Sequence, residues 1–131
     1  MAGIPSDLKY SKDHEWVRSL PDGRLRVGIT DHAQKQLGDI VFVELPKPGD
    51  RFDDFEPFGS VESVKSVSET YMPLGGAVDA VNESLNDAPE QVNDDPYGDG
   101  WMIEITPAAG GLDGLLTAAQ YEDYITAEST G

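Results

Sequence analysis

The 131-residue sequence contains no cysteine, which excludes disulfide bonds, cysteine-ligated metals and thiol catalysis by the chain itself. Any redox-active sulfur would have to be attached to the protein. Basic residues are also scarce, with nine Lys plus Arg against 25 Asp plus Glu, giving a net charge of -16. A surface of this charge repels phosphate backbones and anionic lipid headgroups, so we expect neither nucleic acid nor a membrane as a partner.

The sequence also lacks any apolar run near the roughly 20 residues that a membrane-spanning helix needs. Its first five residues show neither a secretory nor an organelle-import pattern, so we expect a cytoplasmic protein of bacterial type. A chain of this length suits a single domain over residues 1–131. The strong acidity would suit either a highly soluble shuttle protein or a salt-rich cytosol, and composition does not separate the two.

Short alternating segments with turn residues between them dominate the chain and predict a mainly β fold. We expect strands over 13–18, 25–29, 39–45, 77–82 and 101–105, with a loop over 82–100. A short helix over 31–37 follows the first hairpin and ends at Gly38. The tail 110–131 is predicted to be helical, from the spacing of Leu112, Leu115 and Leu116 and from a capping box at Thr117 and Gln120. This pattern favours a β sandwich or barrel with small helices docked outside.

One stretch, residues 59–69, carries a single lysine among β-branched and small hydroxyl residues. Val61, Val64 and Val67 favour extended chain, so the stretch predicts a tight hairpin with Lys65 at its tip. From this segment alone, Lys65 is either an ordinary solvated lysine or an amine displayed to another protein. The pattern Gly-small-Val-acid-small-Val occurs at 59–64 and again at 76–81, which indicates two similar strands on either side of the lysine.

Catalytic roles for these residues are poorly supported. A Schiff-base lysine needs burial or a cationic neighbour, whereas Glu62 and Glu69 favour the charged, unreactive ammonium of Lys65. The nearby serines lie in no Gly-x-Ser-x-Gly elbow and are better interpreted as small residues that keep the tip uncluttered.

Metal and nucleotide sites are poorly supported as well. His14 and His32 lie in segments that we take to be unrelated, form no metal-ligand spacing, and are expected at the surface or a strand edge. The acidic turn 94–100 lacks the ligand spacing of a calcium loop, and no glycine-rich phosphate loop is present. We therefore expect no catalytic residue and no metal site.

The lysine hairpin closely resembles the lipoyl-attachment motif of the glycine cleavage system H protein family, in the order Gly59-x-Val61-Glu62-Ser63-x-Lys65-x-x-Ser68-Glu69. A biotin carrier would have methionine on both sides of the lysine, and a dehydrogenase-complex lipoyl domain typically has Asp-Lys-Ala, whereas this chain has Val64-Lys65-Ser66. The similarity continues in order along essentially the whole chain, through residues 14–16, 28–34, 37–46, 73–76, 81–82 and 93–102.

The resemblance implies a barrel-sandwich hybrid fold and a carrier that is not an enzyme. Lipoate would be amide-linked to Lys65, by lipoate ligase or lipoyl transferase. The carrier would take an aminomethyl group from glycine decarboxylase (P protein) to aminomethyltransferase (T protein), and its dithiol would be reoxidised by dihydrolipoamide dehydrogenase (L protein). The absence of cysteine fits this chemistry, because a native thiol could exchange with the carried dithiol.

The same resemblance implies a cleft beside the hairpin that holds the loaded arm. Glu15 and Glu69 match acidic cleft positions, where a carboxylate would pair with the primary ammonium of the cargo. Gln36 stands where some members have histidine, so it would offer hydrogen bonding without acid-base chemistry. Glu62 and Glu69 would also provide context for the enzymes that meet Lys65. Two alternatives stay open: a lipoate relay to other lipoyl domains, and an acidic binding module with an unmodified Lys65.

Overall fold

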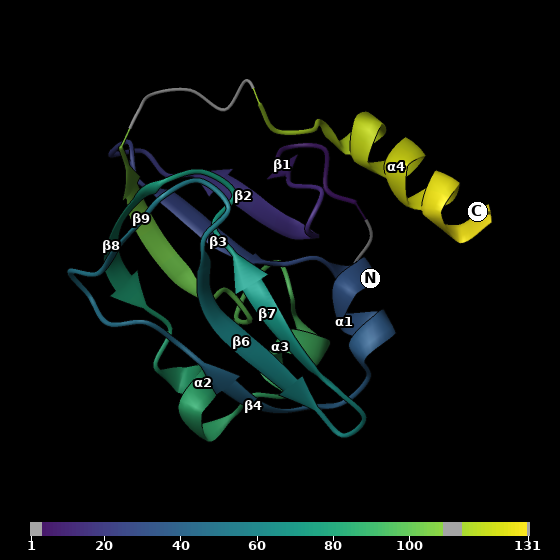
Figure 1. Ribbon diagram of the computed structural model, residues 1–131, viewed down its shortest axis with the longest axis horizontal. Coiled ribbons are helices and arrows are strands. Elements are labelled where there is room, and N and C mark those ends of the chain that lie inside the picture. Colours follow the sequence, from purple (N-terminus) through teal and green to yellow (C-terminus); the bar gives the residue numbers. More distant parts are fainter. Residues whose placement is uncertain (1–3, 109–113, 131) are drawn as a thin grey trace.

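The computed structural model describes residues 4–108 and 114–130, which form two antiparallel sheets with short helices around them (Figure 1). The larger sheet has the strand order β1-β2-β3-β9-β8-β5, and the smaller one has the order β4-β6-β7. The strands are β1 Lys9–Tyr10, β2 Glu15–Ser19, β3 Leu25–Ile29, β4 Ile40–Glu44, β5 Arg51–Phe52, β6 Pro57–Ser63, β7 Val67–Tyr71, β8 Gly76–Val81 and β9 Ile103–Pro107. The helices are α1 Asp31–Leu37, α2 Ser84–Asp87, α3 Gln91–Asp94 and α4 Ala118–Thr130. The predicted mainly β class, with a helix after the first hairpin and another near the C-terminus, is confirmed.

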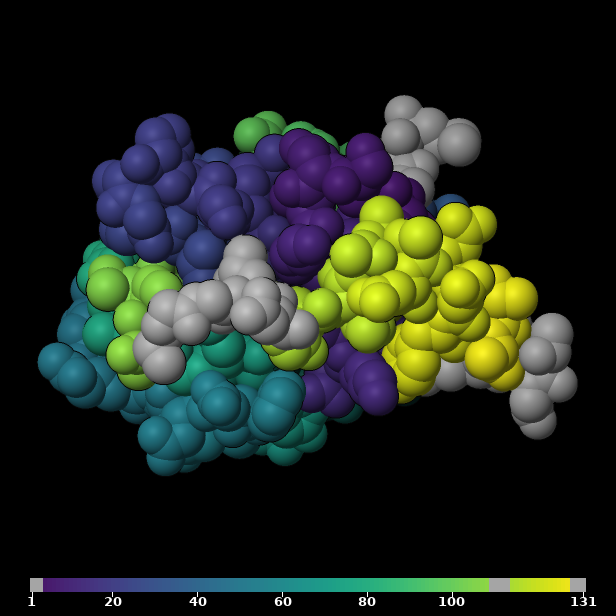
Figure 2. All heavy atoms as spheres, turned by 90° about the horizontal axis from the view of Figure 1, so that it is seen from above, coloured from purple at the N-terminus to yellow at the C-terminus, as the bar shows by residue number. Residues whose placement is uncertain are grey.

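The main apolar core lies between the two sheets. Val27 and Ile105 reach it from the larger sheet, and Val43 and Val61 reach it from the smaller one. A second cluster joins Leu8, Tyr10 and Trp16 to Tyr121 of α4. Figure 2 shows α4 packed beside the N-terminal segment, with its C-terminal part projecting from the body.

The first hairpin, β2–β3, is built around Trp16, which is fully buried. Gly28 pairs with it across the strands, and a Cβ at Gly28 would lie 2.8 Å from the indole ring atoms. The absence of a side chain at Gly28 therefore leaves the space that the Trp16 indole occupies. The indole N–H donates to the carbonyl of Pro96 at 2.8 Å, so the ring also fixes a distant loop.

The predicted helix over 31–37 is confirmed with its termini. Thr30 caps α1 because its Oγ1 accepts a hydrogen bond from the backbone N–H of Ala33 at 3.2 Å. Gly38 ends the helix at φ 85°, a left-handed conformation that favours glycine, and its N–H donates to the carbonyl of Gln34.

The predicted strand over 39–45 and the lysine hairpin are also confirmed, as β4 and the pair β6–β7. The two copies of the repeated pattern become β6 and β8, which belong to different sheets. The two-residue strands β1 and β5 had no signal in the sequence, because two residues show no periodicity.

Two predictions in the C-terminal half are wrong in detail. The predicted loop over 82–100 contains α2 and α3, each a single turn without a side-chain cap. The predicted strand over 101–105 is displaced, and β9 begins at Ile103.

The tail differs in part from the prediction of a helix over 110–131. The capping box before α4 is confirmed by reciprocal bonds between Thr117 and Gln120, at 2.9 and 3.2 Å. Leu115 and Leu116 are not helical, and Leu116 instead forms an isolated bridge with Tyr10, while Leu112 lies outside the described residues. Among the described helices, none is long and apolar enough to cross a bilayer.

Candidate functional site

Lys65 lies at the exposed turn between β6 and β7, as the sequence predicts. The turn is held by the buried side chain of Ser63, whose Oγ accepts from the backbone N–H of Lys65 at 3.3 Å and of Ser66 at 3.1 Å. Val64 N–H donates to the carbonyl of Asp39 at 3.0 Å, which ties the turn to the start of β4. The backbone of the tip is therefore fixed while the lysine side chain faces solvent.

The turn lies close to the end of α1 (Figure 1). A Cβ placed on Gly38 would lie 3.6 Å from Cε of Lys65, so the lysine stem passes over the residue that ends the helix. A side chain at Gly38 would narrow this passage.

A cavity of about 130 Å³ lies beside the hairpin, between β7, α1 and the start of β2. It brings together three of the predicted site residues, Glu15, Gln36 and Glu69. The other two lie outside its lining: Lys65 is at the turn, and Glu62 is exposed on β6 in register with Phe42 and Val67. The full lining consists of Asp13, His14, Glu15, Ile29, Ala33, Gln36, Leu37, Val61, Ser68, Glu69 and Thr70.

The cavity walls divide into apolar and acidic parts. Ile29, Ala33, Leu37 and Val61 supply hydrocarbon surface. Asp13, Glu15 and Glu69 supply carboxyl groups, and the described lining contains no lysine or arginine. Such a cavity fits a ligand that has an apolar stem and a positively charged end.

Glu15 is the most buried of these acids, with 1% of its surface exposed. Its Oε1 lies 2.6 Å from Ser11 Oγ, and its Oε2 accepts from the backbone N–H of Tyr71 in β7 at 3.2 Å. Burial, assisted by the charge of Asp13, raises the pKa of Glu15 from 4.5 to about 8 in spite of these two hydrogen bonds. Glu15 is therefore mostly protonated at neutral pH until a positive charge enters the cavity.

A polar group of the cavity lining also lacks a partner within the described chain. The hydroxyl of Thr70 is buried and makes no hydrogen bond there, although the residue is only 2% exposed. A buried hydroxyl without a partner is costly, so Thr70 is a locally unfavourable polar group in the wall of the cavity.

The expectation that His14 and His32 lie in unrelated segments was wrong. Their rings lie 4.9 Å apart, both residues are only partly exposed, and His14 lines the cavity. The signal was available in the β2–β3 hairpin: its register pairs Glu15 with Ile29, so the residues just before β2 meet those just after β3. The contact of Tyr121 with this region had no such signal, since α4 is distant in sequence.

Comparisons with known proteins agree with this geometry. A family model described as Glycine cleavage H-protein matches residues 8–128. The glycine cleavage system H protein of Chromohalobacter salexigens is 53% identical over 129 residues, covering 98% of each chain. That of Anoxybacillus flavithermus is 58% identical over 123 residues, covering 93% of this chain and 96% of the other.

Among solved structures, the crystal structure of a glycine cleavage system H protein from Mycobacterium marinum superposes with a TM-score of 0.83 at 41% identity. The match covers 96% of this chain and 99% of that one. The chain therefore belongs to the glycine cleavage H-protein family.

Proposed function

We propose that Lys65 carries lipoate in amide linkage and that the cavity beside the hairpin holds the loaded arm. A glycine cleavage H protein is the lipoyl carrier of the glycine cleavage system and is not one of its catalysts. One observation supports the assignment to Lys65 most directly. The strand that follows the exposed lysine turn, β7, contributes Ser68, Glu69 and Thr70 to the wall of the acidic cavity.

The residues of the cavity fit the proposed group. The apolar wall of Ile29, Ala33, Leu37 and Val61 matches hydrocarbon and sulfur. Lipoate linked to Lys65 would supply a disulfide that accepts the aminomethyl group and is later reoxidised. The chain itself would bind the arm, limit its contact with water and pair with its charge.

Glu15 and Glu69 are the proposed partners of the cargo ammonium. Glu15 offers a carboxyl group at the buried side of the cavity, and Glu69 offers one from an exposed position on β7. An ammonium beside Glu15 favours the ionised carboxylate and so lowers its pKa from about 8, which makes binding of the cationic cargo stronger at alkaline pH. Gln36 would donate or accept hydrogen bonds at the cavity wall.

The partners we propose are the other components of the glycine cleavage system and a lipoylating enzyme, acting in the cytoplasm. Lys65 is presented with Glu62 and Glu69 on the two strands beside it, which gives a ligase or transferase acidic contacts near the amine. The P, T and L proteins would then meet the arm in turn. We also propose that residues 1–131 act as one carrier domain.

Intact-mass measurement tests the attachment site. The protein co-expressed with a lipoate ligase is expected to gain about 188 Da, and Lys65→Arg should abolish the gain. Lys47→Arg, which alters another exposed lysine, is the matched control and should retain it. A gain that survives Lys65→Arg, or none in wild type with active ligase, would contradict the proposal.

A second experiment tests the cavity. Glu15→Ala should speed loss of the aminomethyl group from the loaded protein, because the ammonium loses an acceptor in a site shielded from water. The mass gain at Lys65 should be unchanged. Equal release rates for wild type and variant would show that Glu15 does not retain the cargo.

A further inference from the structure

Tyr121 of α4 is fully buried against the body of the protein, and its hydroxyl reaches two residues of separate segments. It lies 2.8 Å from Nδ1 of His14 and 2.8 Å from Oγ1 of Thr30. His14 lines the cavity directly. Thr30 caps α1, the helix that supplies a second wall of the same cavity through Ala33, Gln36 and Leu37.

The His14 wall depends on an unfavourable backbone conformation. His14 has φ 70°, in the left-handed region that non-glycine residues seldom adopt. His14 directly precedes β2, and it lines the cavity together with its neighbours Asp13 and Glu15. Backbone bonds hold this turn, from His14 N–H to Ser11 O at 3.2 Å and from Thr30 N–H to His14 O at 3.0 Å. The Tyr121 hydroxyl fixes the imidazole that the turn presents.

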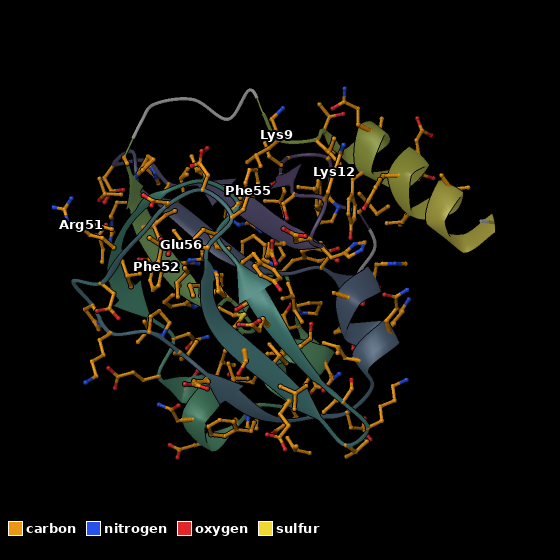
Figure 3. All side chains as sticks on the ribbon, in the orientation of Figure 1. Lys9, Lys12, Arg51, Phe52, Phe55 and Glu56 are labelled. Atoms are coloured by element: carbon orange, nitrogen blue, oxygen red, sulfur yellow. The ribbon has the colours of Figure 1, made fainter. Side chains whose placement is uncertain are left out.

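The ring of Tyr121 is itself fixed by stacking on Tyr10, with centroids 4.7 Å apart and an interplanar angle of 7°. Tyr10 lies between Lys9 and Lys12, which Figure 3 places on the side of the body where α4 begins. Helix α4 therefore places the Tyr121 hydroxyl, held by this stacking, between His14 and the start of α1.

We propose that Tyr121 is a positioning residue for the arm cavity: its hydroxyl holds the His14 wall and the start of α1 together, so the packing of α4 sets how well the cavity protects the arm. This inference rests on the proposed function, since it assumes that the cavity receives the arm carried by Lys65. It assigns to the C-terminal helix a role in cargo protection, although none of the described cavity-lining residues belongs to α4.

The stacked pair offers a matched test. Tyr121→Phe removes the hydroxyl that contacts His14 and Thr30, while Tyr10→Phe removes one that donates to the carbonyl of Pro5, away from the cavity. Both residues are fully buried in the same cluster. We expect the loaded arm to lose its aminomethyl group about fivefold faster in Tyr121→Phe than in wild type, the effect of losing one hydrogen bond. Tyr10→Phe should stay close to wild type.

Hydrogen exchange in the unmodified protein gives a readout that needs no lipoate. The Ala33 amide, bound to Thr30 Oγ1, and the Tyr71 amide, bound to Glu15, should exchange faster in Tyr121→Phe than in Tyr10→Phe. Equal exchange and equal release rates in two variants of similar unfolding free energy would overturn the inference and leave Tyr121 a structural residue. If the loaded arm of wild type loses its aminomethyl group as fast as aminomethylated dihydrolipoamide free in solution, arm protection, and with it the proposed role of the cavity, fails.

Discussion

The two copies of the Gly-small-Val-acid-small-Val pattern perform opposite tasks in the same protein. Both form strands, β6 and β8, and both bury their first valine, Val61 and Val78, in the main core. Both also begin at a glycine that lies against a neighbouring strand. A Cβ on Gly59 would collide with the carbonyl oxygen of Glu44, and one on Gly76 would collide with that of Thr106.

The copies diverge at their ends. In the first copy the last valine, Val64, lies just past the end of β6, is 70% exposed and is followed by the displayed Lys65. In the second copy the residue equivalent to Lys65 is Asn82, which is buried and donates to the carbonyls of Asp99 at 2.7 Å and Trp101 at 2.8 Å. The same local pattern therefore builds either a display site or an anchor, and the following residue with its tertiary contacts decides which.

The shared glycine gives the largest expected effect. Gly59→Ala and Gly76→Ala should each lower the free energy of unfolding by about 3 kcal/mol or more, because the added methyl group forces two paired strands apart. Urea denaturation of both variants measures the loss. A cost under about 1 kcal/mol at either site would mean that the two copies do not share this packing requirement.

A pH titration tests the surroundings of the first copy alone. Glu15 accepts a hydrogen bond from the Tyr71 amide of β7, and β7 is the partner strand of β6. The pKa of Glu15 is about 8 in the folded protein, above its ordinary value of 4.5, so the folded state holds a proton that the unfolded chain has lost between these pH values. The contribution of Glu15 to stability is thus present below pH 4.5 and declines as pH rises toward 8. Between pH 4.5 and 7 this decline amounts to about 3 kcal/mol.

Glu15→Gln keeps a neutral side chain of the same shape at every pH and should remove that decline. Denaturant unfolding of wild type and variant at several pH values measures the difference between them. If the two stability curves run parallel from pH 4.5 to 8, the carboxyl group is not held neutral in the folded protein.

The lysine hairpin and the helix beside it were easier to predict from the sequence than the segment that follows β8, and the reason is physical. The lysine hairpin, α1 and its caps depend on residues close in sequence, such as Thr30 and Gly38, so local patterns were sufficient. The helices α2 and α3 are single turns of four residues, too short for a helical spacing of apolar residues to repeat. The environment of Glu15 combines burial with contacts from Ser11 and Tyr71, and the second of these is 56 residues away.

The candidate site shows the same division. Family resemblance placed Glu15, Gln36 and Glu69 at one cleft, and the cavity does contain all three. The contact between His14 and Tyr121 joins residues 107 positions apart, on a strand border and on a helix without any shared motif. Such contacts arise from the packing of α4 on the body, which no local pattern specifies.

The residue that directly follows each copy provides the last and smallest test, a comparison of Asn82→Ala with Lys65→Ala. Removing the Asn82 amide leaves the carbonyls of Asp99 and Trp101 without their donor and should lower the free energy of unfolding by about 2 kcal/mol. Lys65 is exposed at its turn, so its truncation should change that energy by less than about 0.5 kcal/mol while abolishing lipoylation. Thermal or urea unfolding measures the first quantity and intact mass the second. A stability loss at Lys65 equal to that at Asn82 would contradict the contrast between a display site and an anchor, since it would make the displayed lysine part of the structural framework.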